Sequence, residues 1–269
     1  MKKLALTLLF IFTLTLLSAC EAETYTVTFV DYNALEISSQ TVSEGDDANL
    51  PSEPNRIGYN FIGWDKTHTN IKEDTIIQAQ YEENETLTSF NALLTSVHEA
   101  TRIEALTQVI DNEQLTQEVY YSREERKVYS KKTGEEEVTI YINEEDGVLF
   151  GYDYNKDTDC YTKVNISQYQ FDYIFVDHTN SHMLPDRIEL SWFDIDGDTY
   201  TLNPEYKENL KARIGATGNF VSYVITITET GLELDIELIF GAATRTIHIE
   251  YTNIGTQTQS IPEDLYTCS

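Results

Sequence analysis

Residues 138–154 have the sequence VTIYINEEDGVLFGYDY, in which two alternating runs flank Asp146 and Gly147. A run in which apolar and polar side chains alternate presents one apolar face, which is typical of a half-buried β-strand. An Asp-Gly pair between two such runs is a strong signal for a tight turn. The stretch therefore predicts an antiparallel hairpin with strands at 138–142 and 148–154.

The same pattern extends to both sides of this hairpin. Further short runs of strand character, separated by turn residues, are found at residues 118–121, 127–129, 160–164, 187–193, 199–202, 219–228, 231–240 and 243–252. Apolar residues spaced by three and four predict an amphipathic helix over residues 86–101, and residues 204–214 predict a shorter one. The aromatic segment 167–183 fits either a strand or part of a helix. We therefore expect residues 86–269 to form an antiparallel β domain.

A smaller module precedes this domain, over residues 24–82. It begins with the alternating strand Tyr-Thr-Val-Thr-Phe at 25–29 and ends with the strand Thr-Ile-Ile-Gln-Ala-Gln-Tyr at 75–81. Between them, residues 35–42 predict a second strand, and residues 58–64 read Gly-Tyr-Asn-Phe-Ile-Gly-Trp. A short acidic stretch then separates the module from the larger domain.

The Gly-Tyr-x-Phe-x-Gly-Trp pattern of residues 58–64, with its flanking strands, resembles the internalin-type B repeat, also called the Listeria–Bacteroides repeat. The resemblance implies a small β-grasp fold on bacterial surface proteins, where such repeats serve as spacers or contact other proteins. The chain has one copy, which weakens an adhesive role that depends on multivalency. We expect Trp64 in the core of the module rather than as a binding hot spot.

The larger domain resembles the lipoprotein-carrier superfamily of LolA and LppX. The resemblance rests on the order of helices and strands, on Asp-Gly-Asp-Thr-Tyr-Thr-Leu at 196–202, and on Ile-Pro-Glu-Asp at 261–264. It implies a curved antiparallel half-barrel whose concave side is covered by helices and, in some members, carries acyl chains. A generic antiparallel β lipoprotein domain is the alternative. The expected fold class is mainly β (α+β), a β-grasp module followed by a half-barrel with one or two covering helices.

The chain opens with the pattern of a secretory signal. Lys2 and Lys3 precede an uncharged run at 4–17, and small residues precede Cys20 in Leu-Ser-Ala-Cys. The run has 14 residues, whereas a helix that spans a membrane needs about 20. An ordinary secretory signal with a chance cysteine is the alternative to a lipoprotein signal.

Leu-Ser-Ala-Cys resembles the bacterial lipobox, in which the cysteine receives a diacylglycerol and becomes the new N-terminus. The resemblance implies a signal peptide at 1–19 and a lipidated tether at 20–23. Acyl chains such as palmitate on Cys20 would then hold the protein on the extracytoplasmic face of the cell membrane, because two chains give stable anchoring.

The chain is strongly acidic, with 46 acidic and 18 basic residues and a formal net charge of −28. Nucleic acid is excluded as a partner, because phosphate binding requires clustered Lys and Arg. Anionic headgroups should repel the chain, so its membrane attachment depends on the lipid. Outside the cytoplasm, Cys160 and Cys268 can form one disulfide or stay free.

Two clusters have the spacing of metal ligands. Asp194, Asp196, Asp198 and Glu205 match four positions of an EF-hand loop, but the glycine is misplaced and strands flank the loop, so a hairpin is expected. His178 and His182 lie four residues apart, in a stretch that is a poor helix, so an exposed loop is expected rather than zinc. We expect no catalytic residue, metal or cofactor.

The expected function is non-catalytic binding at the cell surface, to a protein partner or to an apolar ligand. A LolA/LppX-like carrier of lipid or lipoprotein acyl chains is the first alternative, and an extracytoplasmic hydrolase is the second. An apolar cavity of roughly 300–1,000 Å³ in residues 86–269 would favour the carrier. A filled core would favour a binding or spacer module, and clustered carboxylates with raised pKa values would favour the hydrolase.

Overall fold

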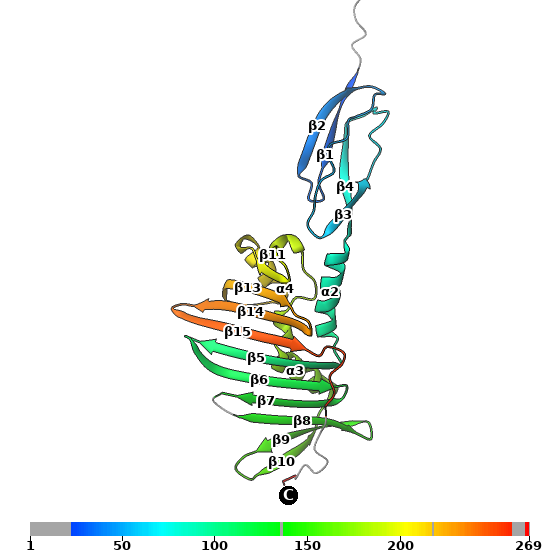
Figure 1. Ribbon diagram of the computed structural model, residues 1–269. Coiled ribbons are helices and arrows are strands. Elements are labelled where there is room, and N and C mark those ends of the chain that lie inside the picture. Colours follow the sequence, from blue (N-terminus) through cyan, green and yellow to red (C-terminus); the bar gives the residue numbers. More distant parts are fainter. Residues whose placement is uncertain (1–22, 135–136, 217, 260–266, 269) are drawn as a thin grey trace, which may run out of the picture. The chain divides into compact units, whose positions relative to one another are not determined.

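The computed structural model describes residues 23–134, 137–216, 218–259 and 267–268. The chain folds as two compact units, which divide between Asn84 and Glu85 (Figure 1). The expected signal peptide, Cys20 and the tetrad at 261–264 lie outside the described residues. Within those residues, no helix is long and apolar enough to cross a membrane.

The first unit is a four-stranded mixed sheet. Its strands are β1 (Thr24–Val30), β2 (Glu36–Ser43), β3 (Tyr59–Trp64) and β4 (Thr75–Glu83). They lie in the order β2-β1-β4-β3, with β1 and β4 parallel and the other neighbours antiparallel. The predicted alternation in β1 buries Val27 and Phe29, which form a core with Ile77. The Trp64 ring packs edge-on against Phe29, with 4.9 Å between ring centroids.

The parallel strands β1 and β4 need a crossover connection, and a β-grasp fold is expected to have a helix in it. The connection from β2 to β3, which forms this part of the crossover, differs from that expectation. Residues 44–58 contain no helix, and Pro51 and Pro54 disfavour one. The Gln40 amide holds this segment in place, since it donates to Asn49 O at 2.7 Å and accepts from Asn49 N at 2.9 Å. An extended loop therefore takes the place of the helix.

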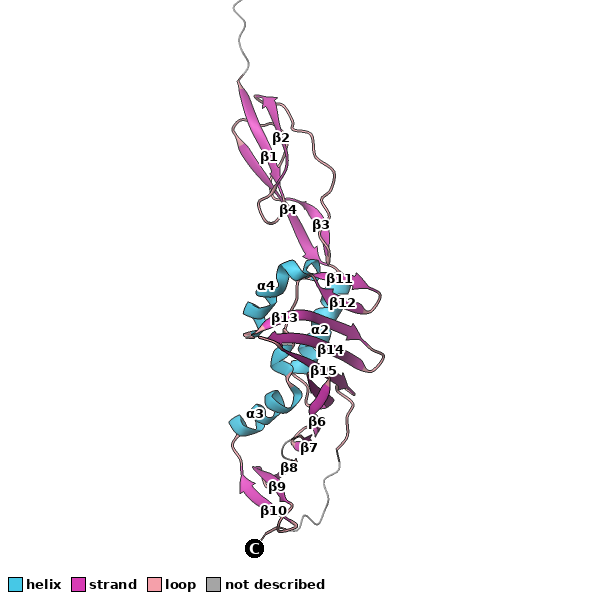
Figure 2. Cartoon of the chain, turned by 90° about the vertical axis from the view of Figure 1, so that its left-hand side faces the viewer, coloured by secondary structure: helices cyan, strands magenta, loops and turns pink. Residues whose placement is uncertain are grey.

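Among the described residues, the second unit forms one open antiparallel sheet of eleven strands, with helices on one face (Figures 1 and 2). Its strands are β5 (Arg102–Asp111), β6 (Gln114–Glu124), β7 (Lys127–Thr133), β8 (Val138–Glu145), β9 (Val148–Asn155), β10 (Cys160–Asn165), β11 (Phe193–Asp196), β12 (Thr199–Leu202), β13 (Asn219–Ile227), β14 (Gly231–Phe240) and β15 (Ala243–Thr252). Its helices are α2 (Glu85–His98), α3 (Gln168–Thr179) and α4 (Lys207–Ile214). The mainly β fold class is confirmed.

The strand order is β10-β9-β8-β7-β6-β5-β15-β14-β13-β12-β11. Hairpins connect most neighbours, but β5 pairs with β15, the first strand of the unit with the last. No strand was predicted at the position of β5, between the helix expected over 86–101 and the strand expected at 118–121. Ala105 and Thr107 on the inner face of β5 are small or polar and give a weak apolar alternation. Both are nevertheless buried.

The helices pack on the inner face of the sheet through large aromatic side chains. Phe90 of α2 lies 4.4 Å from Tyr200 of β12, measured between ring centroids. Tyr223 of β13 and Tyr251 of β15 are fully buried, and their hydroxyls donate to backbone carbonyls at the ends of the covering segments, those of Met183 and Thr179, each at 2.8 Å. Burial raises the pKa of both phenols, so they stay neutral donors.

We expect Gly231→Ala to destabilise the second unit. A Cβ at Gly231 would lie 1.9 Å from the carbonyl oxygen of Tyr251, so β14 and β15 would have to separate. Overpacking of this kind typically lowers the free energy of unfolding by about 1–3 kcal/mol. Urea denaturation should detect the loss.

Gly147→Asn is the matched control, because Gly147 lies in a turn with open space where a Cβ would be built. Its effect should stay below about 1 kcal/mol, since Asn tolerates the left-handed backbone conformation. Equal denaturation midpoints for Gly231→Ala and the unchanged chain would contradict the close approach of β14 and β15.

Candidate functional site: a groove beside helix α3

Helix α3 resolves the segment that sequence patterns left ambiguous. Its N-terminus is a capping box, in which Ser167 Oγ accepts from Gln170 N at 3.2 Å and Gln170 Oε1 accepts from Ser167 N at 2.8 Å. Its last residue is Thr179, and Asn180 forms the C-cap with a left-handed φ of 50°. The reciprocal cap satisfies two backbone donors that a helix otherwise leaves unpaired, which favours the helix over a strand.

One side of α3 is fixed on strand β6. Phe175 packs against Tyr121 with 5.9 Å between ring centroids, and the Arg123 guanidinium lies 4.7 Å from the centre of the Phe171 ring. Burial lowers the pKa of Arg123, and the aromatic face compensates part of its lost hydration. The opposite side of the helix carries Tyr169, which is 77% exposed.

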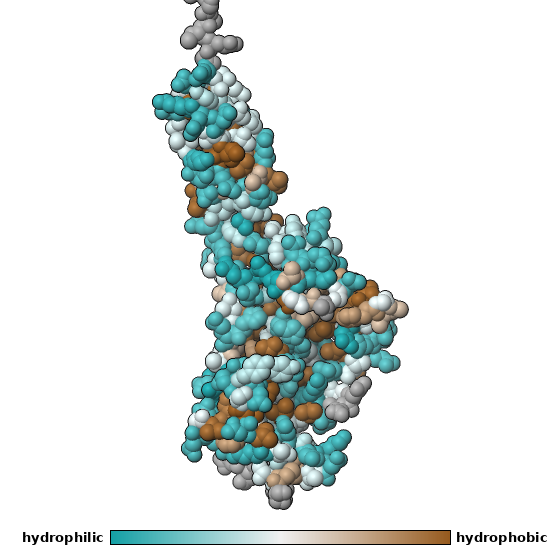
Figure 3. Space-filling model, turned by 180° about the vertical axis from the view of Figure 1, so that it is seen from behind, coloured by the Kyte–Doolittle hydropathy of each residue, from teal (hydrophilic) through white to brown (hydrophobic). Residues whose placement is uncertain are grey.

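A groove of about 300 Å³ lies between α3 and strands β8, β9 and β10. We call it the α3 groove. It is lined by Ile140, Gly151, Asp153, Val164, Ile166, Tyr169, Gln170, Tyr173 and Ile174. A Cβ at Gly151 would lie 3.3 Å from Ile166 Cγ2, so glycine keeps the floor of the groove open. Figure 3 views the helix-covered face and shows hydrophobic side chains gathered in the lower part of this unit.

The lining of the α3 groove is mostly apolar, with Asp153 as its one carboxylate. Asp153 lies opposite Ile140 in the pairing of β9 with β8. Asp153 is exposed on one side, and partial desolvation by the apolar wall on the other side raises the pKa of its carboxyl group. The groove can therefore hold an apolar chain along Val164 and Ile174, with its polar end near Asp153 or solvent.

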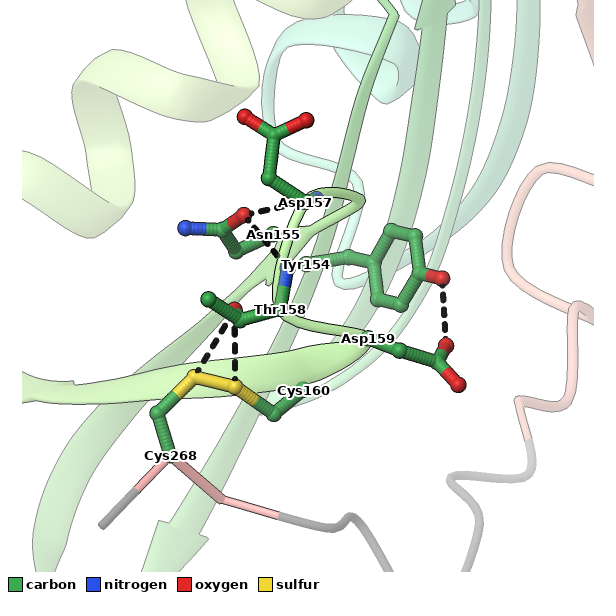
Figure 4. Close-up of a disulfide and its surroundings, with 7 residues drawn as sticks. All are labelled: Tyr154, Asn155, Asp157, Thr158, Asp159, Cys160 and Cys268. Atoms are coloured by element: carbon green, nitrogen blue, oxygen red, sulfur yellow. Dashed lines mark hydrogen bonds between the residues drawn. A yellow bond between two sulfur atoms is a disulfide. The ribbon is translucent and has the colours of Figure 1, made fainter.

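A disulfide between Cys160 and Cys268 fixes the C-terminal end of the chain to β10, the edge strand of the sheet. The Cα atoms are 5.2 Å apart and 108 residues separate the two cysteines. Cys268 N also donates to Tyr161 O of β10 at 2.9 Å. The Thr158 hydroxyl lies 3.0 Å from Cys160 Sγ and 3.6 Å from Cys268 Sγ, and both contacts are drawn as dashed lines in Figure 4. Of the two states left open by the sequence, the structure contains the bonded pair.

Cys268→Ser should lower the free energy of unfolding by about 2–5 kcal/mol, because the bond constrains a long loop of the unfolded chain. Cys160→Ser should cause a similar loss. The double variant should be no less stable than either single variant, since one bond is lost in each case. Urea denaturation with and without reductant measures all four proteins, and additive losses would contradict a shared disulfide.

The structure brings together one serine, one histidine and one aspartate that sequence reasoning did not connect. Ser130 Oγ lies 2.7 Å from His178 Nδ1, and His178 Nε2 lies 3.6 Å from Asp177 Oδ2. The prediction of an exposed loop at His178 was wrong, because the residue lies in α3 and is buried. Ser130 is 1% exposed and His178 9% exposed, and burial lowers the pKa of His178. The neutral His178 ring and the Ser130 hydroxyl therefore meet each other's need for a hydrogen-bond partner inside the helix–sheet interface.

The remaining candidate ligands do not converge. Asp194, Asp196 and Asp198 lie on the exposed β11–β12 hairpin, whose turn contains Gly197 with a φ of 57°. His182 is exposed in the short 3₁₀ turn after α3. In the described ranges, no group of three or more His, Cys, Asp or Glu side chains could hold a metal ion. The hairpin predicted around Asp194, Asp196 and Asp198 is confirmed.

Residues 25–89 match the family model of the Listeria–Bacteroides repeat domain, a module typical of the extracellular surface of bacteria. The match covers the first unit and the first residues of α2. It confirms the resemblance inferred from the Gly-Tyr-x-Phe-x-Gly-Trp pattern at 58–64. The chain matches no curated protein. The first unit thus carries a Listeria–Bacteroides repeat.

Proposed function

We propose that this chain is a membrane-anchored bacterial surface lipoprotein that acts as a non-catalytic binding module. The match of residues 25–89 to the Listeria–Bacteroides repeat carries the proposal, because such repeats are typical of extracellular surface proteins. The formal net charge of −28 supports a role away from nucleic acids. The repeat serves as the module nearer the anchor in sequence, and the second unit provides the binding surface.

The anchor is the lipid on Cys20. The Leu-Ser-Ala-Cys tetrad resembles a lipobox, and the run before it is short for a spanning helix. An acidic chain is repelled by anionic headgroups, so electrostatic attraction does not replace the acyl chains.

Metabolic labelling with a palmitate analogue tests this anchor in the producing bacterium. The unchanged chain should take up the label and fractionate with membranes, whereas Cys20→Ala should carry no label. Cys160→Ser is the matched control and should be labelled fully, because it removes a cysteine at the edge of the second unit. Label on Cys20→Ala, or no label on the unchanged chain, would contradict a lipid anchor on Cys20.

The α3 groove is the binding site that we propose on the second unit, and its ligand is an apolar chain. Its walls are isoleucine, valine and tyrosine side chains, and its volume of about 300 Å³ is at the lower end of the range for ligand sites. The LolA/LppX-like carrier of acyl chains is the alternative that the same groove supports, because it too needs an apolar site under helices.

Val164→Glu should abolish binding in the α3 groove, because a carboxylate in an apolar site is costly. Val164 is 41% exposed, so the fold should tolerate the change. Asn165→Glu is the matched control, since its side chain points to the other face of β10. The probe is a photoactivatable alcohol with a short apolar chain, and peptide mass spectrometry locates its crosslinks.

The unchanged chain and Asn165→Glu should be labelled within residues 140–174, and Val164→Glu should lose at least about nine-tenths of that label, which corresponds to about 1.4 kcal/mol. Equal labelling of Val164→Glu and Asn165→Glu would eliminate the groove as the site. Lipid that co-purifies with the unchanged chain in native mass spectrometry would favour the carrier.

A further inference from the structure

A second cavity, of about 580 Å³, opens on the inner face of the sheet at the other end of α3. We call it the Lys132 cavity. It is lined by Val109, Asp111, Thr116, Gln117, Lys132, Gly134, Val138, Asn180, Arg245 and Ile247. The lining comes from strands β5, β6, β7, β8 and β15 and from the residue that forms the C-cap of α3. This cavity shares no lining residue with the α3 groove.

Two of the three charged side chains in the lining neutralise each other. Arg245 donates from Nε to Asp111 Oδ1 at 2.7 Å and from Nη2 to Asp111 Oδ2 at 2.9 Å. Thr116 Oγ1 donates to Asp111 Oδ2 at 3.0 Å as well. These hydrogen bonds from Arg245 and Thr116 lower the pKa of Asp111, so the pair stays ionised and adds no net charge to the cavity.

Lys132 is the third charged group, and it forms no ion pair with any described residue. Its neighbour Lys131 points to the outer face of β7 and pairs with Glu137 at 3.6 Å. Val128 and Ser130 alternate with Lys132 along β7 and are buried, so Lys132 lies on the inner face of the strand. Burial and the Lys132 ammonium both lower the pKa of His178 in α3. The lining therefore carries a net positive charge, although the chain as a whole has a formal charge of −28.

The rest of the lining is suited to the uncharged part of a ligand. Val109, Val138 and Ile247 form apolar walls, and the Gln117 and Asn180 amides provide hydrogen-bonding groups. Asn180 Nδ2 also contacts Thr107 Oγ1 at 3.5 Å. A ligand with one anionic group and a compact apolar body would pair with Lys132 and cover the apolar walls.

We propose that the Lys132 cavity binds a small amphiphile that carries one singly charged anionic group, such as a carboxylate, sulfonate or phosphodiester. Lys132 is the one ammonium of the lining without an ion pair among the described residues, and it sets the number of negative charges, because a polyanion would be repelled by the acidic chain around the cavity. This inference goes beyond the proposed function, whose ligand is uncharged and binds in the α3 groove.

Titration calorimetry with two matched probes tests this proposal. Naphthalene-1-sulfonate has the anionic group, and 1-naphthylmethanol has the same rings without the charge. The full chain is held in nanodiscs of neutral phosphatidylcholine, and the heats of empty nanodiscs are subtracted. The unchanged chain should bind the sulfonate in a saturable manner, with higher affinity than the alcohol.

Lys132→Gln should weaken sulfonate binding about fivefold to tenfold and leave alcohol binding unchanged. Lys132→Arg should keep most of the affinity for sulfonate. Lys131→Gln is the matched control, because it removes one charge from the same strand on the other face, and Val164→Glu controls for the α3 groove. Both controls should bind the sulfonate as the unchanged chain does.

The unchanged chain provides a test that needs no substitution. Raising the salt concentration from about 0.05 M to about 0.5 M should weaken sulfonate binding and leave alcohol binding unchanged, because salt screens the ion pair. Equal affinities for both probes, sulfonate binding that Lys132→Gln leaves intact, or equal losses in Lys131→Gln and Lys132→Gln would each overturn the proposal.

Discussion

The pairing of β5 with β15 is the interaction on which the second unit depends. It joins the first strand of the unit to the last, in antiparallel register from Glu104–Thr252 to Asp111–Arg245. On one side of this seam lies the meander β6–β10, and on the other lie β14 to β11. Within each set, neighbouring strands are close in sequence and are joined by hairpins or, between β12 and β13, by a segment that contains α4. The pairing of β5 with β15 instead requires a contact between residues more than a hundred positions apart. Without the seam, the sheet would present two more open edges.

Helix α3 packs close to that seam, and its size explains why cavities remain beside it. Tyr251 of β15 donates to the carbonyl of Thr179, and Tyr121 of β6 packs against Phe175, so the helix is held from both sides of the seam. A helix is about 10–12 Å wide, whereas strands are about 4.8 Å apart. One helix therefore covers about two strands. The uncovered inner face toward β8–β10 becomes the α3 groove, and the space beyond Asn180 becomes the Lys132 cavity.

The sequence predicted the elements whose signals are local. The hairpins around Asp146-Gly147 and Asp196-Gly197 and the three long strands before residue 253 have strong alternation and turn residues, and the structure contains all of them. The first helix was predicted from its apolar spacing. Its end was placed too late, because β5 begins at Arg102 with a weakly apolar inner face.

The segment of α3 shows why periodicity alone was insufficient. Tyr169, Phe171, Tyr173 and Phe175 alternate at period two, which suits a strand, while Phe171 and Phe175 also fit one side of a helix. The Ser167–Gln170 capping box decides between them, and it was visible in the sequence. The two cavities, unlike the helices and hairpins, could not be predicted from local sequence patterns. Their linings come from several strands and one helix, so their positions follow from tertiary packing that no local pattern encodes.

The dimensions of the α3 groove help to decide whether the protein binds part of an apolar chain or carries a whole one. A carrier must shield most of its cargo from water, and ligand sites that do so bury 70–90% of the ligand. The α3 groove measures about 300 Å³, and Tyr169 and Tyr173 on its rim are 77% and 56% exposed. A long acyl chain would extend beyond such a groove and leave apolar surface in water, at roughly 25 cal/mol for each Å². A short apolar segment, or the end of a chain that is buried elsewhere, avoids that cost. The proposed binding role therefore fits these dimensions better than the carrier does.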